Sequence, residues 1–138
     1  MIRNYQDHSN KVKDWIDVAT PRLSSPELIK LFELAVTKLW LRSCITIGDV
    51  TVLAIVDRAL TTCAQVHKVS IPLSIGPTGI PWDEFRQAAS NLSKDEIIQA
   101  LAYFTTEFIA IASSITGEFL SAPLHKELAS VTLKNKNI

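Results

Sequence analysis

The feature that most constrains the fold of this chain is a series of large apolar residues in its second half, spaced alternately by four and three positions. The series consists of Ile97, Leu101, Phe104, Phe108, Ile111 and Ile115. This spacing places an apolar seam along one side of an α-helix, where it can pack against neighbouring helices. Ser93 and Glu96 precede the seam as a capping box, and Gly117 follows it as a natural helix stop. We therefore predict a helix over residues 94–116, about 34 Å long.

Helical periodicity also covers most of the remaining chain. We predict further helices over residues 9–19, 25–42, 47–67, 80–89 and 119–131. Ser25, Pro26 and Glu27 support the start of the second of these, as an N-cap, a first-turn proline and an acid favoured by the helix dipole. The β-branched segment 50–56 also fits a strand, but the helical period continues through Leu60 and favours a helix.

The segment 69–81 breaks the helical pattern. Residues 69–75 alternate apolar with small or polar side chains over the length of a strand. Residues 76–79, with the sequence GPTG, then force a turn. We predict an extended arm or a short hairpin around residues 69–81.

Length and hydrophobic content predict one domain. The chain has 138 residues, of which 47 % are hydrophobic, so it can bury a core without the help of a metal or a disulfide. We predict a single all-α domain over residues 1–138, a bundle of five to six helices around 47–67 and 94–116. Residues 1–8 and 134–138 are predicted to be flexible ends.

The balance of charges argues against two classes of partner. Fourteen Lys and Arg residues oppose fourteen Asp and Glu residues, and the pI is about 6.8, so the basic excess of a nucleic-acid-binding protein is missing. The longest stretches without a charged residue, 69–82 and 108–117, fall short of the 18 to 20 apolar residues that cross a membrane. We predict no membrane insertion and, because the N-terminus does not resemble a secretory signal, a cytoplasmic location.

The sequence predicts neither a metal site nor a cofactor. His8, His67 and His125 lack the short helical spacing of metal ligands, and Cys44 and Cys63 do not form a CxxC pair. Both cysteines lie in apolar helical segments, so we predict buried thiols rather than a disulfide. We expect His125 on the surface.

The segment that begins at His67 has a distinctive pattern. Its sequence, HKVSIPL over residues 67–73, places a proline five and a leucine six residues after a histidine. This arrangement is similar to the phosphoacceptor box of sensor histidine kinases, and the resemblance implies that His67 is a phosphoacceptor. Lys68, however, stands where such boxes carry an acidic residue that accepts the histidine proton. We favour the alternative, a histidine whose charge suits the end of a core helix.

Charged residues within two strongly apolar segments are candidates for an ion pair. An ionised side chain in such a position is costly unless it is paired, so Arg58 and Glu107 are candidates for a buried pair between helices. Asp57 and Arg58 project about 100° apart on a helix, so only one of them has to be buried. Two solvated helix faces are the alternative that we favour.

Aromatic residues suggest a ligand pocket. Trp40, Trp82 and Tyr103 are the candidate lining residues, although core filling explains most aromatic side chains in a domain of this size. A separate group of small residues in the predicted helix 94–116 allows another helix to approach closely, either within the chain or across a dimer; they are Ala110, Ala112, Ser113 and Ser114.

The predicted function follows from the apolar seam and from the lack of a recognisable set of catalytic residues. No nucleophile, base and orienting group are recognisable as a unit. We therefore predict a non-enzymatic regulatory or adaptor module in signal transduction, acting by protein–protein association as a homodimer. The six residues of the seam are its interface candidates. A sensor of a small apolar ligand near Trp40 and Trp82 and a phosphoacceptor at His67 are the alternatives.

Overall fold

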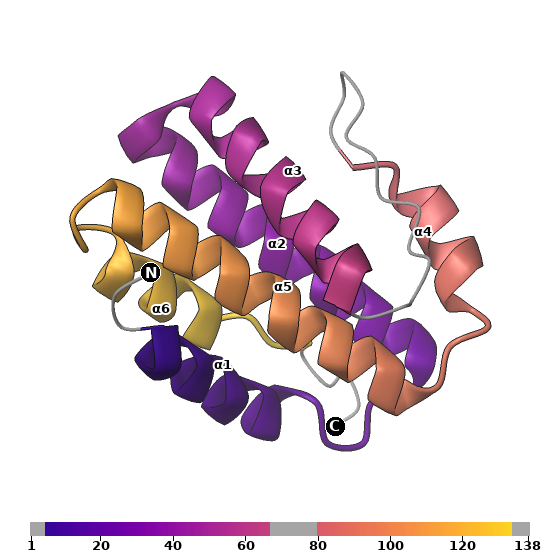
Figure 1. The fold of residues 1–138 in the computed structure, drawn as a ribbon. Helices are drawn as coiled ribbons and strands as arrows, with labels where there is room; N and C mark the ends of the chain where they lie inside the picture. The colour runs from indigo at the N-terminus through magenta and orange to yellow at the C-terminus, as the bar shows by residue number, and fades with distance from the viewer. Residues whose placement is uncertain (1–4, 67–79, 134–138) are drawn as a thin grey trace.

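The computed structural model of the chain describes residues 5–66 and 80–133. Within these residues it contains six α-helices and no strand. The helices are α1 (Tyr5–Ala19), α2 (Ser25–Ile47), α3 (Asp49–Val66), α4 (Trp82–Ala89), α5 (Lys94–Ile115) and α6 (Ser121–Ala129). The prediction of an all-α bundle of five to six helices is therefore confirmed (Figure 1).

The predicted start of α1 and both predicted ends of α2 are wrong. Residues 5–8, predicted to be flexible, belong to α1, because the imidazole of His8 is buried together with the apolar face of the helix. Helix α2 continues beyond the predicted end at residue 42 as far as Ile47, and its N-cap is Ser24 instead of Ser25. Residues 50–56 are helical, as the continuous period indicated.

The predicted arm lies almost entirely outside the described residues. Only Ile80 and Pro81 belong to the described part of the chain, and they lead directly into α4. The prediction that residues 69–75 form a strand, the prediction for His67 and the predicted flexibility of residues 1–4 and 134–138 stay predictions.

The two longest helices begin with the same reciprocal hydrogen bonds. At the start of α5, the Glu96 backbone N–H donates to Ser93 Oγ at 3.1 Å, and the Ser93 N–H donates to Glu96 Oε1 at 2.9 Å. Ser24 and Glu27 form the equivalent capping box at the start of α2. Such a box satisfies two backbone N–H groups that have no partner inside the helix, so it fixes where each helix starts.

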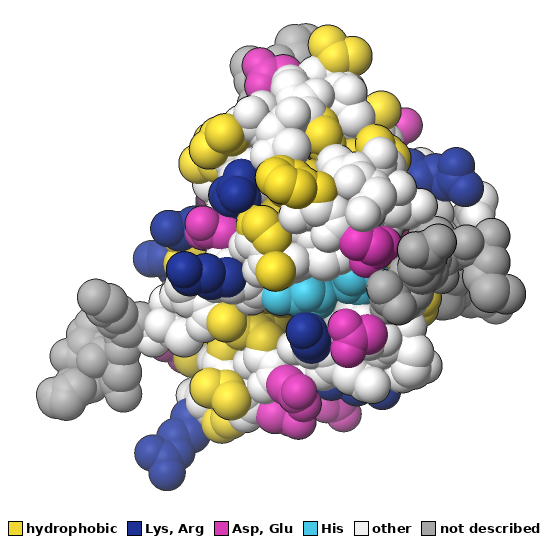
Figure 2. Space-filling view, turned by 90° about the vertical axis from the view of Figure 1, so that its left-hand side faces the viewer, with side chains coloured by type: hydrophobic (Ala, Val, Ile, Leu, Met, Phe, Trp, Pro, Cys, Tyr) yellow, Lys and Arg dark blue, Asp and Glu magenta, His cyan; other side chains and the backbone are white. Residues whose placement is uncertain are grey.

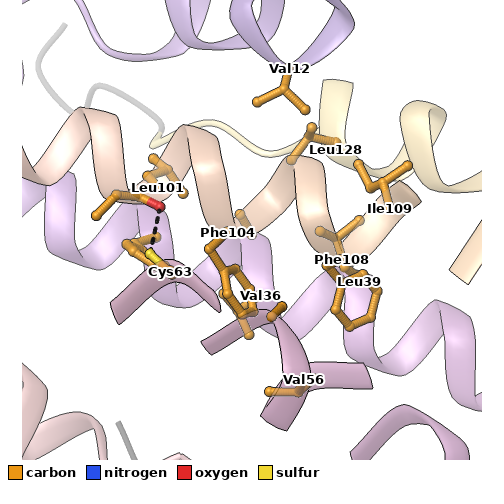
Figure 3. Packing of buried hydrophobic residues seen from close by; sticks show 14 of the residues in the cluster. Val12, Val36, Leu39, Val56, Cys63, Leu101, Phe104, Phe108, Ile109 and Leu128 are labelled. Carbon is orange, nitrogen blue, oxygen red and sulfur yellow. Dashed lines mark hydrogen bonds between the residues drawn. The ribbon is translucent and has the colours of Figure 1, made fainter. Parts of the chain in front are cut away.

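Helix α5 forms the centre of the bundle, with α1, α2, α3 and α6 packed against it (Figure 1). Figure 3 shows Phe104 and Phe108 of α5 pointing toward Val36 of α2 and Val56 of α3. On another side of α5, Ile109 lies near Leu128 of α6 (Figure 3). Each large side chain that is removed from water in this way contributes about 1.5–3 kcal/mol to stability, so α5 organises the core.

By length and composition alone, α5 is the one described helix that could cross a membrane. In its most apolar 18-residue window, however, 61 % of the residues are buried inside the bundle. The central helix of a folded domain has the same length and composition, and the packing of four helices around α5 matches that pattern.

Candidate functional site

The seam is mostly internal core. Ile97, Leu101, Phe104 and Phe108 are at most 1 % exposed within the single chain. These four side chains cannot contact a second chain without unfolding this one, so the prediction that they form an interface is wrong for them. The physical reason is that α2 and α3 already cover this side of α5.

The last two residues of the seam have a different environment. Ile111 is half-buried, and Ile115 is 56 % exposed. Both line a surface groove of about 510 Å³ between α3 and α5, which we call the α3–α5 groove. Its lining residues are Thr51, Ala54, Ile55, Asp57, Arg58, Thr61, Ile111 and Ile115. The seam therefore continues from the core into a depression on the surface.

Exposed apolar side chains gather near this groove, at the end of the bundle where α2 meets α3 and α5 ends (Figure 1). Val50 is 82 % exposed, Ile45 is 80 % exposed and Phe119 is 67 % exposed. Val50 lies one helical turn before Ala54, a lining residue, so both share one face of α3. Figure 2, which faces this end, shows separate hydrophobic side chains over its upper half.

The predicted ion pair between Arg58 and Glu107 is absent. Arg58 is exposed on α3 and forms no ion pair with a described residue. Glu107 is half-buried and instead accepts a hydrogen bond of 2.6 Å from the hydroxyl of Tyr5. Burial, followed by the hydrogen bond to Glu107, raises the pKa of Tyr5. Sequence reasoning missed Tyr5 as the partner of Glu107, because Tyr5 lies in the segment predicted to be flexible.

The three residues predicted to line a ligand pocket lie in different surroundings. Trp82 packs edge-on against Phe32 and Phe85, with ring centroids 6.1 and 5.6 Å away. Tyr103 lines a groove of about 240 Å³ between α1 and α5, and Trp40 is half-buried on α2. None of the principal grooves in the described part of the chain is lined by two of the three.

Both cysteines are free thiols, and the prediction that they are buried is confirmed for Cys63 but not for Cys44. Cys63 is buried in the core, with Sγ 3.8 Å from the carbonyl oxygen of Ala100 (Figure 3). Cys44 is half-buried on α2. Burial is the largest cause that raises the pKa of each thiol to about 11, so both stay protonated and unreactive near neutral pH.

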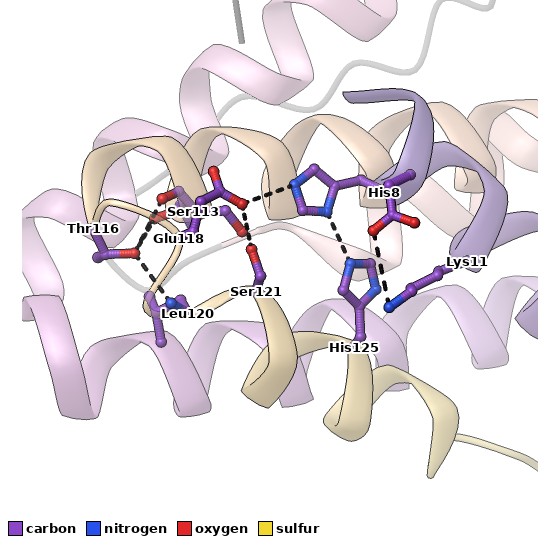
Figure 4. A network of polar contacts seen from close by, with 10 residues as sticks. His8, Lys11, Ser113, Thr116, Glu118, Leu120, Ser121 and His125 are labelled. Atoms are coloured by element: carbon purple, nitrogen blue, oxygen red, sulfur yellow. Dashed lines mark hydrogen bonds and ion pairs between the residues drawn. The ribbon is translucent and has the colours of Figure 1, made fainter. Parts of the chain in front are cut away.

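Two histidines far apart in the sequence meet where α1 lies against α6. His8 Nδ1 and His125 Nε2 are 2.8 Å apart, and the rings stack with centroids at 5.1 Å and an interplanar angle of 19° (Figure 4). His8 is 1 % exposed and His125 is half-buried. His125 therefore lies at the surface only in part, where it lines a groove, because α1 covers part of its ring.

The turn between α5 and α6 places a carboxylate beside this pair. Gly117 and Glu118 both have positive φ, at 60° and 73°, so the chain reverses sharply after α5. Glu118 Oε1 lies 3.8 Å from His8 Nε2 and accepts a hydrogen bond of 2.7 Å from Ser121 Oγ (Figure 4). The carboxylate thus lies next to the ring nitrogen of His8 that points away from His125.

Burial keeps both rings neutral at neutral pH. Burial is the largest cause that lowers the pKa of His8, and it also lowers the pKa of His125, to about 4. Within residues 5–66 and 80–133, His8 Nε2 and His125 Nδ1 have no hydrogen-bond partner. Among the described residues, no three His, Cys, Asp or Glu side chains are grouped as a metal ion requires, so the pair is best described as a proton-sharing contact.

A sequence signal for His8 existed. His8 lies one turn before Val12 and two turns before Ile16, so it belongs to the apolar face of α1. The helix prediction began at Ser9 and excluded it. No local signal identifies His125 as its partner, because the two residues are 117 positions apart.

Comparison with protein-family models, with curated proteins and with solved structures gave no match for this chain.

Proposed function

We propose that the chain is a homodimeric association module that packs through its α3–α5 groove against the same groove of a second copy. The observation that carries the proposal is the continuation of the apolar seam into an open groove, at an end of the bundle that also carries exposed apolar side chains. Val50, Ile115 and Phe119 are each more than half exposed, although large apolar residues are normally placed inside a domain. Exposed apolar groups that gather in one region favour an interaction surface.

The charges at the groove favour a second copy as the partner. Asp57 and Arg58 both line the groove, both are exposed, and neither forms an ion pair with a described residue. In a two-fold interface, a residue that contacts a second residue on the partner is itself contacted in the reciprocal way. Asp57 of one copy then lies opposite Arg58 of the other, and the reverse, so the groove complements itself in charge.

The proposal assigns the chain an association role without catalysis. Burial raises the pKa of the Cys44 and Cys63 thiols to about 11, so neither is a ready nucleophile near neutral pH. A two-fold helical module can carry out the regulatory or adaptor role that the sequence predicts by presenting two identical surfaces to a partner.

The experiment compares three substitutions of exposed aliphatic residues by glutamate, followed by light scattering after gel filtration. Val50→Glu and Ile115→Glu introduce a charge at the proposed interface, whereas Val18→Glu introduces the same charge on α1, at a residue that is 78 % exposed. We expect the unmodified chain and Val18→Glu to be dimers, and the other two variants to be folded monomers. A monomeric unmodified chain, or equal weakening by Val18→Glu, would contradict the proposal.

A further inference from the structure

The contact between α1 and α6 rests on a small number of specific interactions. The buried indole of Trp15 donates a hydrogen bond of 2.9 Å to the carbonyl oxygen of Val131, just beyond α6. The second polar contact is the histidine pair, His8 with His125. Beside them runs a groove of about 410 Å³, which is lined by Lys11, Asp14, Trp15, Val18, His125, Leu128, Ala129 and Thr132. Solvent therefore reaches one edge of the contact, next to the ring of His125.

The distance between the two rings limits how many protons the pair can hold. When both rings are neutral, one of the two facing nitrogens donates its hydrogen and the other accepts it, which a separation of 2.8 Å requires. When His8 Nδ1–H is the donor, one added proton is compatible with this arrangement, because it can occupy His8 Nε2, which faces Glu118 Oε1 at 3.8 Å. The ring nitrogen that faces His125 is unchanged by this step.

A second added proton is not compatible with the docked helices. When both rings are imidazolium ions, every ring nitrogen carries a hydrogen, so His8 Nδ1–H and His125 Nε2–H would point at each other across 2.8 Å. The hydrogen bond between the rings is then lost, and two positive charges are held together in a partly buried place. The rings must then turn away from each other or separate, and either change weakens the contact between α1 and α6.

We propose that His8 and His125 form an acid-sensitive latch, which holds α1 on α6 at neutral pH and releases it when both rings are protonated. Release loosens the contact of α1 with α6. Because α1 packs more extensively against α5, its apolar face, formed by Val12, Trp15 and Ile16, is uncovered only in part. The latch lies outside the α3–α5 groove, so the result of its test does not depend on whether the proposed dimer forms.

The charged groups around the pair come from α1 and from the turn before α6. Asp7 and Glu118 favour protonation of His8, and Lys11 opposes it. His8 and Lys11 oppose protonation of His125, and Asp7 favours it. No charged residue of α5, which packs against both helices, acts on either ring among the described residues. Burial outweighs the favourable carboxylates and lowers the pKa of both rings.

The direction of the pH dependence follows from proton linkage. In the open form both rings are solvated and take up protons near pH 6.5, whereas the docked pair takes up its second proton only near pH 4. The open form therefore binds more protons between these values. Acidification through this range favours release, and each extra proton bound raises the opening constant by up to about tenfold per pH unit.

Hydrogen exchange of the full-length chain, followed peptide by peptide by mass spectrometry, tests the latch. After correction for the intrinsic pH dependence of exchange, we expect opening of α1 to increase about tenfold to a hundredfold between pH 6.5 and about 4.5. Peptides from α5 should change far less. Equal protection of α1 at both pH values would overturn the proposal.

Two variants assign the effect to the pair. His125→Phe keeps a ring for stacking but cannot take up the second proton, so the acid-induced opening of α1 should disappear. His67→Gln removes the remaining histidine of the chain and should keep the opening unchanged. If the opening of α1 increases on acidification in His125→Phe as much as in the unmodified chain, the latch is disproved.

Proton NMR of the unmodified chain provides a second readout that does not depend on a variant that folds. The ring protons of His8 and His125 should titrate in two separate steps, the lower of them below about pH 5. Two coincident transitions near pH 6.5 would show that the rings are not coupled, and the proposal would fail.

Discussion

Truncation of Phe108 to alanine tests whether the seam is the core of the single chain. Phe108 is fully buried, and its ring centroid lies 6.3 Å from that of Phe104. Replacement of a buried phenylalanine by alanine removes its transfer free energy and leaves a cavity, which together cost about 3–5 kcal/mol. A domain of this size has a total stability of about 5–15 kcal/mol, so Phe108→Ala should lose roughly a fifth of it or more.

The matched control is Phe119→Ala, because Phe119 is 67 % exposed and near the proposed interface. Urea unfolding should be measured at two protein concentrations that differ about a hundredfold, since dimerisation stabilises the folded chain by mass action. The loss of unfolding free energy caused by Phe108→Ala should be the same at both protein concentrations. The loss for Phe119→Ala should be within about 0.5 kcal/mol at the lower concentration and larger at the higher one. A loss below about 1 kcal/mol for Phe108→Ala would refute the assignment of the seam to the core.

Three further predictions follow from local features. The free energy of unfolding should fall by about 2–3 kcal/mol between pH 6.5 and pH 4, after allowance for the partial exposure of His125. The reason is that the unfolded chain binds protons in this range that the folded histidine pair does not bind. Urea titrations at several pH values measure this loss, and a constant free energy of unfolding would contradict it. Arg22→Gly should stabilise the chain by about 0.5–1 kcal/mol, because Arg22 is exposed and has a φ of 72°; an unchanged or lower melting temperature would show that its backbone is not strained. Incubation with a histidine kinase and labelled ATP should leave no acid-labile phosphate on His67, because Lys68 replaces the acidic residue of the phosphoacceptor box; label that His67→Ala abolishes would restore that hypothesis.

The features of the fold that sequence predicted best are those set by local chemistry. The capping box of Ser93 and Glu96 and the spacing of the seam define α5 without reference to the rest of the chain. The choice of a helix over a strand for residues 50–56 depended on the period and was also correct. These patterns concern residues that are neighbours along one helix, so a single sequence contains them.

The features that sequence missed depend on contacts between distant segments. Tyr5 takes Glu107 as its partner across 102 positions, and His8 takes His125 across 117, and no spacing rule connects such residues. The same limit explains why the seam was assigned to an interface. Periodicity showed that its residues share one helix face, but it did not show where along the helix that face leaves the core. The change falls between Phe108, which α2 and α3 cover, and Ile115, which lines the groove.

Sedimentation equilibrium of a charge-reversal series tests the proposed dimer most directly. In a two-fold interface that pairs Asp57 with Arg58, the single variants Asp57→Arg and Arg58→Asp each place like charges opposite one another. The double variant restores opposite charges in exchanged positions. The account predicts a dimer for the unmodified chain, weaker association for each single variant, and recovery of the dimer in the double variant. Association that is equally strong in all four chains, or a double variant weaker than both single variants, would contradict it.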